Sequence, residues 1–230
     1  MSSATHTQNL AQAKPSSSLY IIGMLSLVST LCGIVIVLVY QLTLEPIARN
    51  LAVITNQAVG QVLPGGASQT IFALNQDGAL EIVPDISGPG QKLFAVYDDD
   101  GELLGVATEA AGPGYGGIIR LMYAYSPERE AITGFSVLAS TETPGLGDKI
   151  VNDDEFLQNF EELEAKTVED RLANPITPVK HGTKSNPWEI DGISGATVSS
   201  DAVGNIINDS AQKTIPLIRQ NLDLIRSGAK

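Results

Sequence analysis

The stretch Lys92–Thr108, KLFAVYDDDGELLGVAT, has the pattern of two strands joined by a tight turn. Aliphatic and aromatic residues fill Lys92–Tyr97 and Glu102–Thr108, and Asp98–Gly101 between them has the composition of a turn. A calcium-binding loop is a poor alternative for the three aspartates, because its twelve-residue spacing and terminal glutamate are missing. We therefore predict an antiparallel hairpin here.

Two further hairpins flank this one. Each combines two short apolar segments with a polar turn between them. The predicted strand pairs are Thr70–Leu74 with Ala79–Val83 and Gly117–Tyr125 with Ala131–Ser140, joined by turns at Asn75–Gly78 and Ser126–Arg129.

A helix is predicted before the hairpins, at Glu45–Leu63. Pro46 stands near its start, where helices tolerate proline, and Pro64-Gly65-Gly66 ends it. Its apolar residues recur at helical spacing. They are Leu51, Ile54, Ala58 and Val62.

Two more helices are predicted after the hairpins. The first is Asp153–Glu164, which Asn152 or Asp153 can cap. The second begins at about Ser200, and we expect Pro216 to break it before a short terminal helix. Their apolar stripes are Phe156, Leu157, Phe160 and Leu163, and Val203, Ile206 and Ile207; between the two, a polar stretch with Pro175, Pro178 and Pro187 is expected to be loop.

Consecutive hairpins with helices at both ends predict an α+β fold built on an antiparallel sheet. The chain has 230 residues, enough for one ordinary domain and an appendage or for two small domains. The single cysteine, Cys32, excludes an internal disulfide and a Cys-based zinc site, and the two histidines, His6 and His181, are far apart in the sequence. We expect no metal site.

The appendage is the apolar run Leu19–Tyr40, LYIIGMLSLVSTLCGIVIVLVY, which contains no Asp, Glu, Lys or Arg. Its length as a helix is roughly 33 Å, enough to cross a bilayer core. A buried core helix, a cleaved signal peptide and a lipoprotein anchored at Cys32 are the alternatives. No small-residue cleavage site follows the run, and the bulky Leu31 precedes Cys32. We predict an uncleaved transmembrane helix at 19–40 after a flexible tail at 1–18.

Charge does not predict the orientation of this helix in the membrane, because one cation lies on each side of it, Lys14 before it and Arg49 after it. The net charge is −12, and −13 for residues 41–230, since Lys14 is the only charged side chain in residues 1–40. This acidic balance argues against a nucleic-acid partner, which requires clustered cations.

Two loops have compositions suited to ligand binding. Thr141–Asp148, TETPGLGD, has a proline and two glycines that shape the backbone and leave it accessible, although an ordinary Pro-Gly turn has the same composition. Asp191–Ser200, DGISGATVSS, places Thr197 just before a predicted helix whose N-terminus favours an anion such as phosphate. Ser199, Ser200 or Asp201 can cap that helix, and a capping segment without a ligand is the alternative. A Ser-His-Asp hydrolase is disfavoured, because there is no G-x-S-x-G sequence and His181 is the only histidine after the apolar run.

Ser194-Gly195-Ala196-Thr197, preceded by Asp191-Gly192, resembles the signature at which flavin transferases attach FMN to threonine through its phosphate. Glu142–Lys149, ETPGLGDK, looks like the flavin-facing loop of the same family. With one N-terminal anchor and this length, the chain resembles the G subunit of the Rnf electron-transport complex, and Gly114–Gly117 also fits that pattern. The C subunit of the sodium-pumping NADH:quinone reductase is a close second.

The resemblance implies an FMN-binding domain over 41–230, with FMN bound covalently to Thr197 as a phosphoester made by a separate transferase. It implies that the chain carries electrons within a complex of membrane subunits and has no catalytic residues of its own. It also implies a bacterial inner-membrane location with the flavin domain on the periplasmic, outer side. The cofactor-binding residues it indicates are Thr197, Ser194, Gly195, Ala196, Glu142, Thr143, Gly145, Leu146 and Tyr115.

Two other classes of function remain open at this point. The same domain on an anchor could sense redox state as a regulatory module, or both loops could be ordinary turns of a cofactor-free adaptor. The intact mass of the protein made beside its transferase separates these interpretations.

Overall fold

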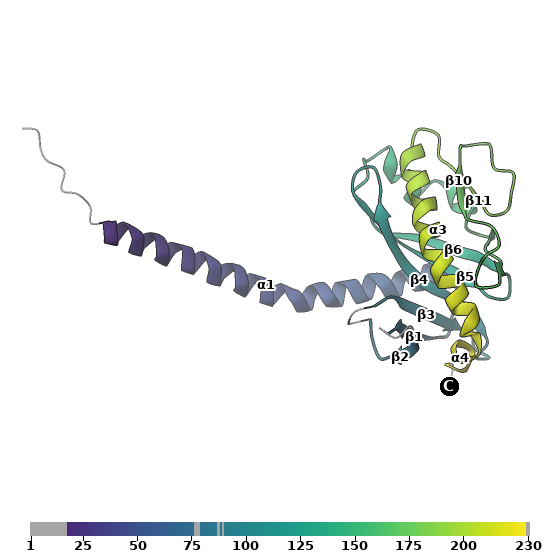
Figure 1. Cartoon of the computed structure of the whole chain (residues 1–230), viewed down its shortest axis with the longest axis horizontal. Helices are drawn as coiled ribbons and strands as arrows, with labels where there is room; N and C mark the ends of the chain where they lie inside the picture. Colours follow the sequence, from purple (N-terminus) through teal and green to yellow (C-terminus); the bar gives the residue numbers. More distant parts are fainter. Residues whose placement is uncertain (1–17, 76–78, 87, 89, 229–230) are drawn as a thin grey trace, which may run out of the picture. The chain divides into compact units, whose positions relative to one another are not determined.

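The computed structural model describes residues 18–75, 79–86, 88 and 90–228 (Figure 1). The predicted tail at 1–18 lies almost wholly outside these residues. The chain divides into two compact units at Arg49/Asn50. The elements are α1 (Ser18–Val62), β1 (Ser68–Leu74), β2 (Leu80–Val83), β3 (Lys92–Tyr97), β4 (Leu103–Pro113), β5 (Ile118–Ser126), β6 (Ala131–Ala139), the 3₁₀ helix η1 (Gly147–Val151), α2 (Asp154–Gln158), β7 (Leu163–Glu164), β8 (Thr167–Val168), β9 (Arg171–Leu172), β10 (Thr177–Val179), β11 (Glu189–Asp191), α3 (Thr197–Gln220) and α4 (Leu222–Ser227).

The first unit consists of α1 up to Arg49. Within the described part of the chain, α1 is the helix that is long and apolar enough to cross a bilayer. The side chains of the predicted span, Leu19–Tyr40, are exposed, which does not fit a core helix. An exposed ion pair between Arg49 and Glu45, at 2.6 Å, lies near its end.

The second unit is built on a seven-stranded antiparallel sheet with the strand order β2-β1-β3-β4-β5-β6-β7. All three predicted hairpins are confirmed, as the pairs Leu74↔Leu80, Leu93↔Thr108 and Tyr123↔Phe135 show. β4 is longer than predicted and continues through a tight turn at Gly114–Gly117 into β5. The fold is therefore α+β, as predicted.

The two faces of the sheet are covered by different helices. Along β3, Leu93, Ala95 and Tyr97 belong to the core beneath α3, whereas Phe94 and Val96 belong to a smaller cluster beneath the end of α1. This alternation follows from the period of two in a strand. The α3 face also covers most of the aromatic side chains, including three fully buried tyrosines.

The buried stripe of α1 differs from the predicted one. Leu51 and Ile54 are 37% and 45% exposed, whereas Thr55, Ala58, Val59 and Val62 are buried. Only the last two turns of this helix meet the sheet, so these residues and Leu63 form the surface that packs on it. Gly134 permits the contact, because a Cβ there would lie 2.1 Å from the Val62 carbonyl oxygen.

The predicted helix Asp153–Glu164 is wrong beyond its first turns. Asp153 caps α2 by accepting the Phe156 N–H at 3.0 Å, but the helix ends at Gln158 and tighter turns follow. Phe156 and Phe160 pack on Phe135 of β6, and Leu163 then pairs with Ile132 as part of β7. Pairing with the sheet edge overrides the helical pattern of the sequence.

Two other predictions need correction. The proline-containing stretch is not all loop, because it forms the parallel pair β10–β11 and the short hairpin β8–β9. Pro216 does not break α3, which continues to Gln220. Burial of Ile215 and Ile218 on the sheet offsets the backbone hydrogen bond that proline removes. The short terminal helix is confirmed as α4.

Candidate functional site

Three loops far apart in sequence meet at one end of α3. They are the turn between β4 and β5, the loop after β6 and the segment that enters α3. Together they line a cavity of about 370 Å³. The lining residues are Tyr115, Glu142, Thr143, Leu146, Gly147, Gly195, Ala196, Thr197, Val198 and Ser199.

The loop after β6 is folded back on itself by its own backbone. The Thr143 carbonyl oxygen accepts the N–H groups of Leu146 and Gly147 at 3.1 and 3.0 Å. Gly145 has φ +77°, a conformation that favours glycine. Gly147 packs so tightly that a Cβ there would lie 2.7 Å from the Ser199 hydroxyl oxygen. The glycines therefore let this loop approach α3 closely.

Glu142 connects all three loops, although only 6% of it is exposed. Its Oε1 accepts the Gly116 N–H at 2.9 Å, and its Oε2 accepts the hydroxyl of Ser199 in the first turn of α3. A buried carboxylate is stable when such donors satisfy it. Glu142 therefore positions the loops beneath the cavity.

Thr197 is the first residue of α3 and is exposed at the cavity. Gly195, with φ +80°, turns the chain into the helix. The helix starts earlier than expected, so Ala196 occupies the cap position, and none of Ser199, Ser200 and Asp201 caps it. Instead the Ser200 hydroxyl accepts the Ile193 N–H at 3.2 Å and donates to the Thr197 carbonyl oxygen at 3.0 Å. The first N–H groups of a helix have no intrahelical acceptor, so an anion attached at Thr197 would meet free donors.

The rim of the cavity is apolar and open to solvent. Tyr115, Leu146 and Val198 are 73%, 54% and 58% exposed, so three large apolar side chains face water around one opening. A flat aromatic group above the cavity would cover these side chains. Among the described residues that line the cavity none is a Lys or Arg, so a phosphate would depend on the N-terminus of α3.

Seven of the nine residues indicated by the sequence line this cavity. Gly145 shapes its loop without lining it, and Ser194 lines a neighbouring cavity of about 230 Å³ with His181 and Asp191. Sequence reasoning did not include Gly147, Val198 and Ser199. All three lie inside the two loops singled out above, and the spacing of Gly147 and Ser199 from Glu142 gave no sign that these two residues lie against it. Within the described residues there is no group of three His, Cys, Asp or Glu side chains that could hold a metal ion.

Known proteins resemble this chain in sequence and in fold. A sequence profile of the FMN-binding domain matches residues 114–212, which include all three loops. The G subunit of the ion-translocating oxidoreductase complex of Cereibacter sphaeroides is 30% identical over 198 residues, 86% of this chain and 83% of the relative. The chain belongs to this family of G subunits. The G subunit of the proton-translocating ferredoxin:NAD(+) oxidoreductase complex of Clostridium ljungdahlii is 27% identical, with 89% and 96% of the two chains covered.

The fold is also that of a solved structure. NqrC of Shewanella oneidensis superposes with a TM-score of 0.53 at 20% identity, covering 69% of this chain and 85% of that one. Family membership makes FMN the cofactor of this domain. The residues present fit it, because the exposed Thr197, the N-terminus of α3 and the apolar rim suit a phosphate at one end and a flat ring at the other.

Proposed function

We propose that this chain is the membrane-anchored flavoprotein subunit of an ion-translocating electron-transport complex of the Rnf type. In this proposal Thr197 carries FMN through a phosphoester. The observation that supports it most is the position of Thr197, which is exposed as the first residue of α3, at a cavity lined by both predicted motifs. When bound, FMN accepts electrons and passes them on.

The residues of the chain hold and orient the cofactor in this proposal. The N–H groups at the start of α3 face the phosphate, and the covalent bond fixes its distance from the cavity. The loop containing Thr143 and Leu146 and the side chain of Tyr115 lie where a ring would extend from Thr197. Glu142, nearly buried at the base of the cavity, acts through the loops that it joins.

The test is the intact mass of the full chain produced beside an active flavin transferase. We expect the wild type to gain the mass of one FMN less one water. Thr197→Ala should gain nothing, whereas Ser194→Ala, which changes the other exposed hydroxyl of the same loop, should gain the full mass. An unmodified wild type would contradict the proposal and favour a cofactor-free adaptor. A modified Thr197→Ala variant would also contradict it.

Membrane anchoring by Leu19–Tyr40 is the second part of the proposal. The exposed apolar side chains of this part of α1 support it. We expect the chain to remain with bacterial inner membranes after alkaline washing. Protease added to spheroplasts should digest the flavin domain if that domain lies on the outer side. A domain that stays intact until lysis would reverse this orientation.

The C subunit of the sodium-pumping NADH:quinone reductase is the second candidate, favoured only by the shared fold. The greater identity to G subunits supports the Rnf type. Co-purification with the other membrane subunits encoded beside this chain would decide between the two complexes. It would also exclude a free-standing redox sensor.

A further inference from the structure

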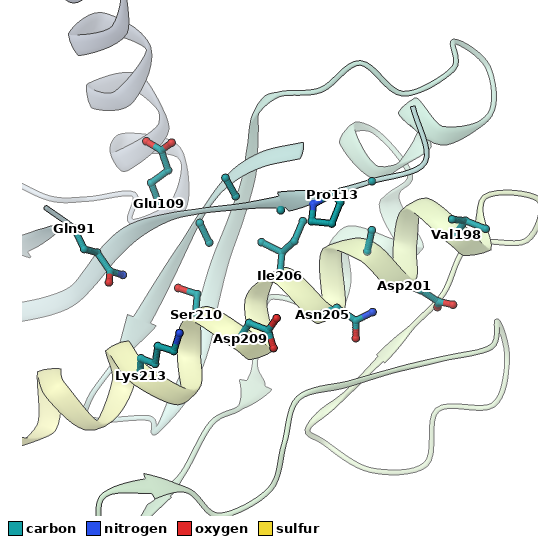
Figure 2. A pocket seen from close by; sticks show the side chains of 15 residues that line it. Gln91, Glu109, Pro113, Val198, Asp201, Asn205, Ile206, Asp209, Ser210 and Lys213 are labelled. Atoms are coloured by element: carbon teal, nitrogen blue, oxygen red, sulfur yellow. The ribbon is translucent and has the colours of Figure 1, made fainter. Parts of the chain in front are cut away.

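A second cavity, of about 670 Å³, forms a groove between α3 and the end of β4 (Figure 2). Figure 2 shows Glu109 and Pro113 along the strand and Val198, Asp201 and Asp209 along the helix. Val198 also lines the cavity at Thr197, so the groove leads directly to the site. Its lining residues are Gln91, Glu109, Ala110, Ala111, Gly112, Pro113, Gly114, Val198, Asp201, Ala202, Asn205, Ile206, Asp209, Ser210 and Lys213.

One wall of this groove is an open strand edge. β4 pairs with β5 as far as Pro113↔Ile118, but its pairing with β3 ends at Thr108↔Leu93. Within the described residues no strand pairs with Ala110–Pro113 on the β3 side. Four residues of β4 therefore present an edge in the middle of the sheet, in line with β3.

The register of the β4–β5 hairpin determines which backbone polar groups point outward on this edge. The Gly114 N–H donates to the Gly117 carbonyl oxygen at 2.6 Å, so these two residues form a hydrogen-bonded pair. Hydrogen-bonded and non-hydrogen-bonded pairs alternate along an antiparallel ladder. The N–H and C=O groups of Gly112 and Ala110 therefore point toward β5. The N–H and C=O groups of Ala111 then point away from β5, into the open lane, whereas Glu109 lies opposite Lys92 of β3, next to the last pair Thr108↔Leu93. An extended chain in that lane would satisfy the Ala111 groups.

The other wall carries negative charge. Asp201 and Asp209 stand eight residues apart on α3, about 12 Å along the helix, and neither makes an ion pair among the described residues. Glu109 is already paired with Arg120, at 2.7 Å. Lys213 is the one cation among the described lining residues, at the far end from Val198.

We infer that this groove binds an extended, basic segment of a partner protein, which adds to the sheet beside Ala110–Pro113. Two cations four residues apart in a strand lie on one face and about 13 Å apart, which matches the separation of Asp201 and Asp209. The segment would end beside Val198 and so bring the partner protein next to the site. The inference goes beyond the proposed function and does not depend on flavin at Thr197.

The probe is the fluorescently labelled heptapeptide TKVTVKT, whose two lysines lie four residues apart. It is titrated with the unflavinylated full chain in detergent micelles, and fluorescence anisotropy is measured. We expect saturable binding that the matched peptide TEVTVET does not show. The double variant Asp201→Asn/Asp209→Asn should weaken binding roughly fivefold, the effect of losing two exposed charge pairs.

A matched control separates the groove from the general acidity of the chain. Asp99→Asn/Asp100→Asn removes the same charge from an exposed turn between β3 and β4, and should leave the affinity unchanged. Bound peptide should also slow hydrogen exchange at the Ala111 amide. The inference is overturned if the lysine peptide does not bind, if both double variants weaken binding equally, or if exchange at Ala111 is unaffected.

Discussion

The two faces of the sheet are packed in different ways. Beneath α3 the strands bury tyrosines and phenylalanines against a helix whose inner side is almost wholly aliphatic. Beneath the end of α1 a smaller cluster makes the contact, with Phe94 and Met122 as its largest side chains, and at Gly134 backbone packs against backbone. Because apolar burial scales with area, the α3 face contributes most of the stability. The α1 face is a shallow contact between the sheet and the end of α1.

The same comparison explains where the site lies. α3 both covers the larger core and supplies Thr197 at its first turn. The site is therefore held by the most stable part of the domain, whereas α1 lines no part of the cavity at Thr197. Changes on the α3 face should affect stability and flavin binding together, whereas changes on the α1 face should affect stability without affecting flavin binding.

The sharpest test of this difference removes the same atoms from both faces. Val203 on α3 and Val59 on α1 are both buried. Val203→Ala should lower the free energy of unfolding by about 2–3 kcal/mol, because the aromatic core around it cannot close the cavity. Val59→Ala should cost about 1–2 kcal/mol, since the smaller cluster can relax. Denaturant unfolding of both full-length variants in micelles measures this; equal losses would contradict the comparison.

The two faces should also respond differently to high pH. Burial raises the pKa of Tyr123 and of Tyr125 to about 12, against 10.0 for an exposed tyrosine. Both lie beneath α3, and none of the described residues in the cluster beneath α1 titrates. A raised tyrosine pKa means that the folded state keeps its proton longer than the unfolded state. The associated stability is complete below about pH 10 and is lost as the pH rises through about 12.

Tyr123→Phe isolates this effect. The hydroxyl of Tyr123 lies 2.9 Å from the Ser210 hydroxyl, and its loss should lower stability at neutral pH by about 1 kcal/mol. Between about pH 9 and pH 12 the variant should lose about 2 kcal/mol less stability than the wild type does. Chemical unfolding at a series of pH values measures both numbers. An unchanged alkaline slope would show that Tyr123 does not titrate with unfolding.

Substitutions of Glu142 test whether one buried side chain holds the loops of the site against α3. Glu142→Ala leaves the Gly116 N–H and the Ser199 hydroxyl without their acceptor and should cost about 1–2 kcal/mol. Glu142→Gln keeps one acceptor oxygen and the shape of the side chain, so its loss should be smaller. The mobility of the attached flavin, measured by fluorescence anisotropy, should rise in the alanine variant. Equal mobility in all three proteins would exclude this positioning role.

Much of this architecture could be predicted from local signals. The hairpins follow from turn residues between apolar segments. The N-terminal helix follows from the length of the uncharged apolar run. The failures occur where a distant partner decides the outcome. Leu163 joins a strand because β6 offers it an edge, and α3 passes Pro216 because the sheet buries the residues on either side. At the site, the two motifs indicated which loops matter, but the contact between Glu142 and Ser199 depends on the fold of the whole domain.

The smallest expected effect is that of Gly60, on the exposed side of α1, and Gly134 on the sheet beneath this helix provides the contrast. Gly60 lies within α1 and a Cβ there would have no neighbour within 4 Å. Gly60→Ala should therefore stabilise the domain by about 0.5–1 kcal/mol, the usual gain from replacing glycine inside a helix. Gly134→Ala adds the same methyl group where it would meet the Val62 carbonyl, so it should instead destabilise this face by about 1–3 kcal/mol.

The pair sharpens the comparison because both changes add one methyl group, at Gly60 on the exposed side of α1 and at Gly134 in the contact between α1 and the sheet. Thermal unfolding of the two full-length variants should shift in opposite directions, with flavin attachment at Thr197 complete in both. If Gly134→Ala were as harmless as Gly60→Ala, the end of α1 would not be packed against β6, and the sheet would have one covered face instead of two.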